Sequence, residues 1–324
     1  MIVFGLEGTA WNLSAALVNE NDVLFEKSAT YVPAKGGIHP RDASQHHAEH
    51  IAEIVGRVLG YVRDNDLKID GIAFSQGPGL GPCLRTVATA SRILSLRLGV
   101  PLIGVNHCVA HIEVGKWQTG AKDPVVIYVS GANSQVLALR QGRYRIFGET
   151  LDISIGNAID KFARSIGLPH PGGPKVEELA RSSINYISLP YTVKGMDLSF
   201  SGLSTAATQA AKKNDLADVC YSLQETAFAM LVEVTERAIA HAEKMEVMLV
   251  GGVGANKRLG QMLNIMCQER GAKFFLPPRK FMGDNGSMIA YTGLIMLKRG
   301  VVVPLSESYI KPGYRADKVP IIWA

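Results

Sequence analysis

The sequence predicts an α/β protein made of two duplicated lobes with a central cleft. Three observations indicate this fold class: the chain has 324 residues of which 47% are apolar, the same order of predicted elements occurs twice, and glycine-bearing turns follow several predicted strands. A chain of this length usually forms more than one core, and this composition supplies the apolar material for two. We therefore expect an N-terminal lobe at residues 1–122 and a C-terminal lobe at residues 123–324.

Both lobes begin with three short apolar segments that are separated by polar or small-residue turns. Residues 2–29 and 125–152 share this pattern, which is typical of a β-meander. A helical spacing of apolar residues follows each meander, at 46–62 and at 157–168. Each lobe thus leads from a small sheet into a helix.

The second half of each lobe repeats as well. Residues 69–107 and 246–278 both read strand, glycine-bearing loop, helix and strand. Between the matched parts, residues from about 170 to 217 are rich in Gly, Pro, Ser and Lys, and we interpret them as an insertion in the C-terminal lobe. The helical apolar pattern after Asn285 is expected to pack back on the first lobe.

The composition disfavours membrane-spanning, secreted and disulfide-rich proteins. No apolar run approaches the roughly 18–20 residues of a membrane span, and the start of the chain lacks the basic region of a secretory signal. We therefore expect a protein without membrane contact. The four cysteines form no CxxC pair, which argues against a disulfide framework or a zinc ribbon and fits a reducing cytoplasm. A formal net charge of +5 permits a nucleic-acid partner without requiring one.

Two histidines four residues apart, His107 and His111 in GVNHCVAHIE, are candidate metal ligands. On a helix both imidazoles would lie on one face and reach one ion. Asp284 in FMGDNGS follows the last strand of the second repeat as His107 follows that of the first, so we expect the two places to face each other across the cleft. Two histidines and one carboxylate suit iron or zinc.

Less specific interpretations of these histidines stay open. An isolated HxxxH is more often a polar pair at a helix start, and a zinc protease would need glutamate where Cys108 stands. Burial explains Cys108 better than ligation does. A further group, His46, His47 and His50, is best explained as the polar start of a helix, so we assign no ligand there.

Three glycine-bearing turns follow predicted strands, at residues 7–9, 130–134 and 251–256. Small residues let backbone N–H groups approach phosphate oxygens, so these turns indicate one nucleotide in the cleft. The motifs GxGxxG and GxxxxGK[ST] are absent, which disfavours a dinucleotide-binding or P-loop enzyme. Asp160 and Glu177 are either solvated helix acids or acceptors for a ribose diol, and the residues alone leave this open.

The ordered set of motifs resembles a known family over nearly the whole chain. EGTA, FSQGPGLGP, GVNHCVAHIE, YVSGANSQV, GNAIDKFAR, PHPGGPKVEEL, KGMDLSFSGL, LVGGVGANKRL and GDNGSMIAYTG are similar to motifs of the tRNA N6-adenosine threonylcarbamoyltransferases. The closest likeness is to the archaeal and eukaryotic cytosolic branch, the catalytic subunit of the KEOPS complex. This resemblance implies the fold of the sugar kinase, Hsp70 and actin superfamily. It also implies transfer of threonylcarbamoyl from threonylcarbamoyl-AMP to N6 of the adenosine 3′ of the anticodon in tRNAs reading codons that begin with A.

The resemblance also implies ligands, partners and site residues. The cofactors would be one divalent metal ion, iron or zinc, and an adenine nucleotide, either threonylcarbamoyl-AMP or ATP. The partners would be tRNA and the other KEOPS subunits, including a small protein kinase-like subunit, in the cytoplasm. The implied metal ligands are His107, His111, Tyr128 and Asp284. The implied adenylate contacts are Tyr128, Val129, Ser130, Gly131, Ala132, Asn133, Asp160, Gly173, Glu177 and Asn256.

Three positions carry further expectations. We hypothesise that Glu7, beside the first glycine turn, is a catalytic residue that orients the incoming amine or accepts its proton. The family usually has glycine where Ala132 stands and often a second asparagine where Lys257 stands. The methyl group of Ala132 is expected to lie near the donor, and the charge of Lys257 could suit phosphate.

Three other functions compete with the transferase. A small-molecule kinase of the same superfamily would need an acid that deprotonates a hydroxyl and no histidine pair, so HxxxH disfavours it. A metalloprotease lacks its base after His107. A scaffold subunit without activity would not need the two histidines and Asp284, all of which are present.

Overall fold

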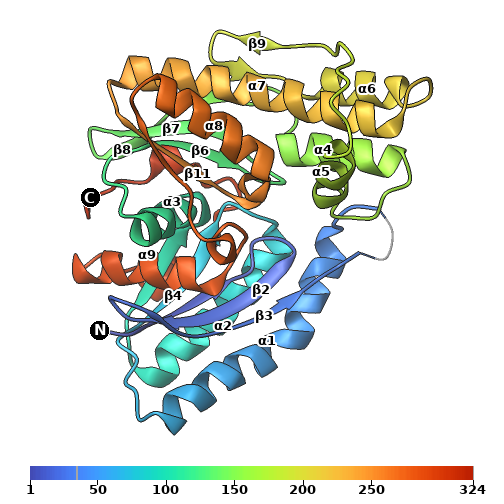
Figure 1. The fold of residues 1–324 in the computed structure, drawn as a ribbon. Coiled ribbons are helices and arrows are strands. Elements are labelled where there is room, and N and C mark those ends of the chain that lie inside the picture. The colour runs from blue at the N-terminus through green and yellow to red at the C-terminus, as the bar shows by residue number, and fades with distance from the viewer. Residues whose placement is uncertain (34–35, 324) are drawn as a thin grey trace. The chain divides into compact units, whose positions relative to one another are not determined.

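The structure is a computed structural model that describes residues 1–33 and 36–323, and it consists of two compact units (Figure 1). The first unit contains Met1–Trp117 together with the chain from Gly283 onward, and the second contains Gln118–Met282. Each unit has its own cluster of buried apolar side chains. The chain therefore passes from the first unit to the second after Trp117 and returns to the first after Met282. The sequence-based boundary between the lobes was residue 122.

The first unit is built on a mixed sheet. Among the described residues its strands are β1 (Val3–Glu7), β2 (Asn12–Val18), β3 (Val23–Thr30), β4 (Gly71–Gly77) and β5 (Leu102–Asn106), in the order β3-β2-β1-β4-β5. The β1–β2 and β2–β3 pairs are antiparallel, whereas β4 pairs in parallel with β1 and with β5. The carboxyl ends of β1, β4 and β5 consequently lie at one edge of this sheet, where open α/β sheets bind ligands.

Helices cover both faces of this sheet (Figure 1). Phe4 and Leu6 of β1 share a buried cluster with residues of α1 (Pro40–Asp64) and α2 (Gly81–Leu98). Because side chains alternate along a strand, Gly5 faces the other side, and there α9 (Gly286–Lys298) packs on the sheet. A Cβ atom on Gly5 would lie 2.4 Å from the backbone nitrogen of Ala290, so this helix packs directly against the strand.

The second unit repeats the strand arrangement. Its main sheet consists of β6 (Val125–Val129), β7 (Ser134–Arg140), β8 (Arg143–Glu149), β11 (Glu246–Val250) and β12 (Lys273–Phe275), in the order β12-β11-β6-β7-β8. Here β6–β7 and β7–β8 are antiparallel, while β11 is parallel to β6 and to β12. The two sheets therefore have the same topology, and the predicted α/β fold with two duplicated halves is confirmed.

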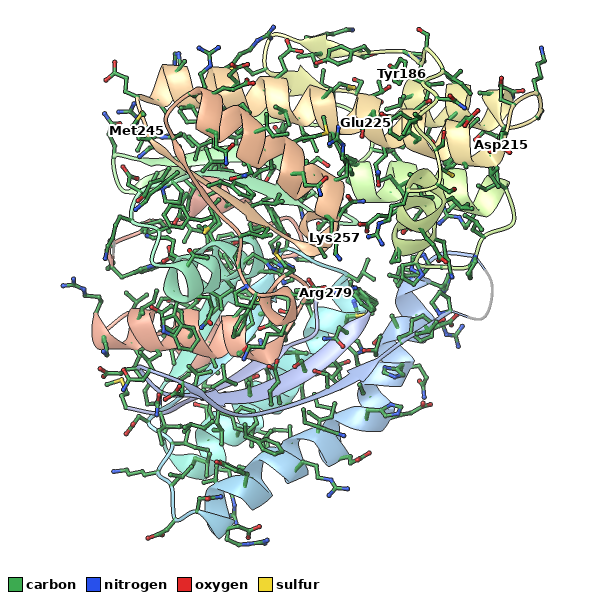
Figure 2. All side chains as sticks on the ribbon, viewed as in Figure 1. Tyr186, Asp215, Glu225, Met245, Lys257 and Arg279 are labelled. Atoms are coloured by element: carbon green, nitrogen blue, oxygen red, sulfur yellow. The ribbon has the colours of Figure 1, made fainter. Side chains whose placement is uncertain are left out.

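The helices of the second unit pack around this sheet. They are α4 (Ile155–Ser165), α5 (Gly173–Ala180), α6 (Ser201–Ala210), α7 (Leu216–Ala242) and α8 (Lys257–Glu269). The small hairpin of β9 (Val193–Lys194) and β10 (Asp197–Leu198) lies with α5 and α6 in the segment predicted to be an insertion. Asp215, labelled in Figure 2, begins α7 by accepting a hydrogen bond from the backbone N–H of Ala217 at 2.8 Å. Within the described residues, no helix combines the length and apolar character needed to cross a membrane.

Asp152 holds the start of α6 and makes the stability of this helix depend on pH. Its carboxylate accepts hydrogen bonds from the backbone N–H groups of Phe200 and Ser201 at 2.9 and 3.0 Å. Partial burial raises the pKa of Asp152, but the hydroxyl of Ser201 and these N–H groups lower the pKa to about 2, from an ordinary value of 3.8. The carboxylate thus stabilises the fold above pH 4, and this contribution is lost as the pH falls toward 2.

We expect Asp152→Asn to lower the free energy of unfolding by roughly 1 kcal/mol at pH 7, a value reduced because the side chain is partly exposed to solvent. The difference between wild type and variant should shrink between pH 4 and pH 2. Urea unfolding at several pH values measures it. A difference that stays constant from pH 7 to pH 2 would contradict this role of Asp152.

Candidate functional site

His107 and His111 lie in the first helical turns after β5. They belong to α3 (His107–Thr119), and the side chain of Asn106 fixes the start of this helix. The Oδ1 atom of Asn106 accepts a hydrogen bond from the N–H of Val109 at 3.1 Å, and its Nδ2 donates to the carbonyl of Tyr314 at 2.8 Å. Both imidazoles are buried, with ring centroids 4.8 Å apart. The four-residue spacing thus places them on one face of a helix, as predicted.

Asp284 completes a cluster with the two histidines. Its Oδ1 atom lies 3.4 Å from Nε2 of His107 and 3.2 Å from Nε2 of His111. All three residues belong to the first unit, because the chain returns to this unit at Gly283. The prediction that Asp284 would come from the other lobe was therefore wrong, although its association with the histidine pair appears in the structure.

Glu7, at the carboxyl end of β1, contacts the other side of the His107 ring. Its Oε2 atom lies 3.1 Å from Nδ1 of His107. Its Oε1 atom accepts hydrogen bonds from the backbone N–H and the hydroxyl of Thr9, at 2.8 and 2.6 Å. The side chain of Glu7 is fully buried. This arrangement resembles a carboxylate that orients a ligating histidine, because it fixes which ring nitrogen carries the proton.

The electrostatics of the cluster favour a positive charge at its centre. Burial lowers the pKa of His107, but the carboxylates of Glu7 and Asp284 outweigh it and raise this pKa well above its ordinary value. Burial lowers the pKa of His111, despite its bond to Asp284. Burial raises the pKa of Asp284, but the positive charge of His107 and the hydrogen bonds from both rings outweigh it, so this pKa is lowered. A proton on His107 thus supplies charge that a bound cation would replace.

The three side chains fit a divalent transition metal. Their ligand atoms all lie within 4.8 Å of one another. A first-row ion bound at about 2.0–2.2 Å from each ligand would separate neighbouring ligand atoms by roughly 3.0–3.5 Å. Two of the three separations, those from Asp284 Oδ1 to the Nε2 atoms at 3.2 and 3.4 Å, lie in this range, and the third is no longer than 4.8 Å. Of the described residues, only His107, His111 and Asp284 form such a group, so the histidines at 46, 47 and 50 lie outside it.

The second unit contains the residues that the resemblance assigns to a nucleotide. Tyr128 and Val129 end β6 and are buried, and the turn from Ser130 to Asn133 follows them. The Oγ atom of Ser130 accepts hydrogen bonds from the N–H groups of Ala132 and Asn133, at 3.3 and 3.0 Å. The turn is therefore shaped by its own serine. Gly131 and Ala132 are exposed, so the extra methyl group of Ala132 fits the fold without a clash.

The turn between β11 and α8 lies beside this first turn. Gly251 has a φ of +92°, and a Cβ atom there would lie 2.3 Å from the carbonyl oxygen of Val129. Only glycine meets both conditions, because a positive φ and a close backbone approach each disfavour a side chain. The chain then runs through a short 3₁₀ turn, Gly252–Ala255, to Asn256. The structure thus brings two of the three glycine-bearing turns together within one unit.

Asn256 is the N-cap residue of α8. Its Oδ1 atom accepts hydrogen bonds from the N–H groups of Arg258 and Leu259, and its Nδ2 donates to Oε1 of Gln224 at 2.7 Å. Glu177 of α5 reaches the same helix start, where its Oε1 accepts a hydrogen bond from the N–H of Lys257 at 3.1 Å. Asn256 therefore shapes the turn, and most of its amide group is already used there.

Figure 2 labels Lys257 at the start of α8 and Glu225 on α7. Glu225 lies on α7 and forms a two-pronged ion pair with the guanidinium of Arg258, at 2.6 and 2.7 Å. The preceding residue, Lys257, is exposed at the first turn of α8. The ion pair fixes the helix start, and the charge of Lys257 stays exposed.

Asp160 lies on α4 and is tied to the loop that leads into α5. Its Oδ1 atom accepts a hydrogen bond from the N–H of Gly172 at 2.7 Å, and its Oδ2 lies 3.4 Å from Nδ1 of His170. Gly173, the next residue, begins α5, and a Cβ atom there would meet open space. Asp160 thus contacts the residue before α5, and Glu177 joins α5 to the start of α8, whereas a shared ligand for Asp160, Gly173, Glu177 and Asn256 stays a prediction.

Several residues at the site are absent from the sequence-based predictions. They are Gln224 beside Asn256, and a polar group on β2 and β3 that consists of Asn12, Ser14, Glu26, Ser28 and Thr30. The polar group has a recognisable signal, because its members alternate along two strands and so share one face of the hairpin. Nothing comparable marks Gln224. Thr9 was expected as part of the first glycine-bearing turn, but its contact with Glu7 was not.

Known proteins resemble the chain over most or all of its length. A family model described as tRNA N6-adenosine threonylcarbamoyltransferase matches residues 22–291. The protein of that name from Methanothrix thermoacetophila is 72% identical over 324 residues, which is 100% of both chains. A "probable bifunctional tRNA threonylcarbamoyladenosine biosynthesis protein" from Methanosarcina mazei is 64% identical over 99% of this chain, which spans 59% of that protein.

Solved structures of low sequence identity share the fold. HypF from T. kodakarensis matches with a TM-score of 0.67 at 15% identity, over 95% of this chain and 48% of that chain. The ROK hexokinase from Thermus thermophilus matches with a TM-score of 0.56 at 16% identity, over 93% of this chain and 100% of that chain. These likenesses concern the fold alone.

Proposed function

Because the chain belongs to the tRNA N6-adenosine threonylcarbamoyltransferase family, we propose that His107, His111 and Asp284 hold a divalent metal ion that assists this transfer. The chain is an enzyme of tRNA modification, and its product is threonylcarbamoyladenosine. The observation that supports the metal site is the clustering of three ligand atoms from residues up to 177 positions apart, within 4.8 Å of one another. Family membership also sets aside the small-molecule kinase, the metalloprotease and the inactive scaffold.

The reaction sets what the site must supply. The N6 amine of the adenosine attacks the carbonyl carbon of threonylcarbamoyl-AMP, so a C–N bond forms, the C–O bond to phosphate breaks, and AMP leaves. The amine loses one proton. Since an adenine amine is a weak nucleophile, the enzyme must hold it close to the carbonyl and stabilise negative charge on the carbonyl or phosphate oxygens.

The first unit would supply the positive charge that stabilises the carbonyl or phosphate oxygens of the donor. A bound iron or zinc ion would polarise the oxygens of the donor. His107, His111 and Asp284 would offer two neutral nitrogens and one carboxylate, a donor set that both metals accept. Glu7 would fix the ring of His107 through its contact with Nδ1, and Thr9 would hold Glu7 in place. The role of Tyr128 as a further ligand stays a prediction.

The second unit would bind the adenylate of the donor. The open turn at Gly131 and Ala132 would approach its phosphate, while Asp160 and Glu177 would offer carboxylates to its ribose hydroxyls. Val129, Ser130, Asn133 and Asn256 would shape this surface, which their hydrogen bonds and close backbone contacts support, and Gly173 would leave open space beside it. The exposed charge of Lys257 would favour the phosphate, and ATP is the other adenine nucleotide that these groups suit.

The partners follow from the family branch. The substrate is a tRNA, which the names of the relatives also carry. The bifunctional relatives are longer than this chain, which spans 59% of the Methanosarcina mazei protein. We propose that this chain works with KEOPS subunits in the cytoplasm of an archaeon, and that a protein kinase-like subunit is one of them.

The metal is tested with preformed threonylcarbamoyl-AMP, so that chelation cannot act on synthesis of the donor. The chain, its partner subunits and tRNA are incubated with this donor, and the modified nucleoside is quantified by mass spectrometry. We expect chelator-treated protein to make at most a few per cent of the product, and iron or zinc to restore it. Full product from metal-free protein would contradict the proposal.

Replacing Glu7 by glutamine separates its two proposed roles. If Glu7 orients His107, Glu7→Gln should weaken metal binding by about 10-fold or more, because loss of such a partner typically costs 10–100-fold. If Glu7 instead accepts the proton of the amine, turnover should fall while metal affinity stays unchanged. The expected result is the first one, measured by competition with a chromophoric chelator. Glu53→Gln, an exposed change on α1, is the control.

A further inference from the structure

We propose that the hairpin of β2 and β3 is a positioning element for Asp284, with Asn12 and Glu26 as the positioning residues. This inference rests on the proposed metal site and assigns it a supporting structure within the first unit. The two histidines share one helix, which sets their separation. Asp284 instead lies on a short segment between Met282, the last residue of the other unit, and the start of α9. Its carboxylate therefore needs support from other residues to stay within reach of the two histidine rings.

Asn12 of β2 holds the backbone of Asp284. Its Nδ2 atom donates a hydrogen bond to the carbonyl oxygen of Asp284 at 2.7 Å, although 272 positions separate the two residues. The hydroxyl of Thr30 donates to Oδ1 of Asn12 at 2.9 Å, which orients the amide with its nitrogen toward Asp284. Asn12 is 7% exposed, so water competes little for this bond. The contact fixes the peptide group to which the Asp284 side chain is attached.

Glu26 of β3 holds the residues that follow Asp284. Its Oε1 atom accepts hydrogen bonds from the N–H groups of Gly286 and Ser287 at 2.8 and 3.4 Å, and its Oε2 accepts from the hydroxyl of Ser287 at 3.3 Å. The hydroxyl of Ser14 on β2 bonds the same carboxylate at 3.1 Å. A carboxylate at a helix N-terminus also meets the positive end of the helix dipole. The first turn of α9 is thus fastened to the hairpin.

Backbone contact adds to these side-chain bonds. A Cβ atom on Gly286 would lie 2.8 Å from backbone atoms of Ala15 and Ala16 in β2, so α9 begins in direct contact with the strand. Asn285 closes the turn itself, because its Oδ1 accepts a hydrogen bond from the N–H of Met288 at 2.7 Å. The carbonyl group of Asp284 is therefore held by Asn12. The helix start that follows Asp284 is held by Glu26 and by close packing against β2. Such support is what keeps a ligating carboxylate within a few tenths of an ångström of its place.

The experiment measures metal binding in Asn12→Ala and Glu26→Gln, using the full chain. Affinity is measured by chelator competition with Zn²⁺, and the visible absorption of the Co²⁺-loaded protein reports the geometry of the ligands. We expect both variants to bind Zn²⁺ at least about 10-fold more weakly than wild type and to show a shifted or weakened Co²⁺ spectrum, with circular dichroism unchanged. Asn12→Asp should resemble Asn12→Ala, because a carboxylate cannot donate the hydrogen bond to Asp284.

Glu20→Gln is the matched control. Glu20 lies at the turn of the same hairpin and contacts the same helix at its other end, through an ion pair with Lys298 at 2.7 Å. It should change neither affinity nor spectrum. Wild-type binding and spectrum in Asn12→Ala and Glu26→Gln would overturn this inference and leave the metal site standing. Failure of the wild-type chain to bind Zn²⁺ or Co²⁺ would overturn both.

Discussion

Replacing His111 by alanine is expected to abolish tight metal binding and to lower the rate of threonylcarbamoyl transfer by about 1,000-fold. The side chain is 1% exposed and its Nε2 lies 3.2 Å from Asp284, so no other group or water can easily take its place. A metal that stabilises charge in the transition state contributes several kcal/mol, and about 4 kcal/mol corresponds to this factor. Single-turnover measurement with preformed donor and saturating tRNA gives the rate directly.

Two further variants belong to this experiment. Asp284→Asn changes a second metal ligand, and His39→Ala is the control. Asp284→Asn keeps the shape of the side chain but removes its charge, so we expect a loss of metal and rate similar to that of His111→Ala. His39 is exposed and lies outside the cluster, and its replacement should leave both quantities unchanged. Urea unfolding of each variant shows whether the fold is retained. A folded His111→Ala protein that keeps at least a tenth of the wild-type rate would rule out the proposed role.

Replacing Gly5 by alanine is expected to destabilise the first unit by about 3 kcal/mol or more. The new methyl group would lie 2.4 Å from the backbone nitrogen of Ala290 and 2.6 Å from the carbonyl oxygen of Gly286. Backbone atoms cannot rotate away as a flexible side chain can, so α9 must move off the sheet. Because only Asn285 separates Asp284 from α9, the variant should also lose metal affinity. Chemical unfolding and chelator competition measure the two effects.

Gly60→Ala is the control for this change. Gly60 lies within α1, and a Cβ atom there would have no neighbour within 4 Å. Alanine is favoured over glycine inside a helix, so this variant should be more stable than wild type by about 0.5–1 kcal/mol. The same substitution is thus expected to have opposite effects at two positions. Equal stability of Gly5→Ala and wild type would contradict the packing of α9 on β1.

The fold was largely predictable because the same order of strands and helices occurs twice in the sequence. The alternation in residues 2–29 and 125–152 reflects strands with one face on a core, and the structure gives both halves the same strand order. The last helix was expected to pack back on the first lobe, although its residues were counted with the C-terminal lobe. The position of Asp284 in that unit could not be read from the repeat, because its place after the last strand of the second repeat pointed to the other lobe.

The site was predictable where chemistry depends on local spacing. His107 and His111 are four residues apart on one helix, so their juxtaposition follows from helix geometry. The contacts from Glu7 to His107 and from Asn12 to Asp284 join residues 100 and 272 positions apart, and no local pattern encodes such distances. The roles of Asn256 and Ser130 were obscured for another reason. Their side chains shape turns through backbone N–H groups, and glycine-rich motifs indicate ligands and tight turns alike.

The proposed function depends on one metal ion that is bound jointly by His107, His111 and Asp284. Crystals of the chain loaded with Fe²⁺ or Zn²⁺, with diffraction recorded on both sides of the metal absorption edge, test it most directly. We expect one strong anomalous peak about 2.0–2.2 Å from Nε2 of each histidine and from a carboxylate oxygen of Asp284. A peak at other residues, or a loaded crystal in which Asp284 still contacts both rings directly, would contradict it.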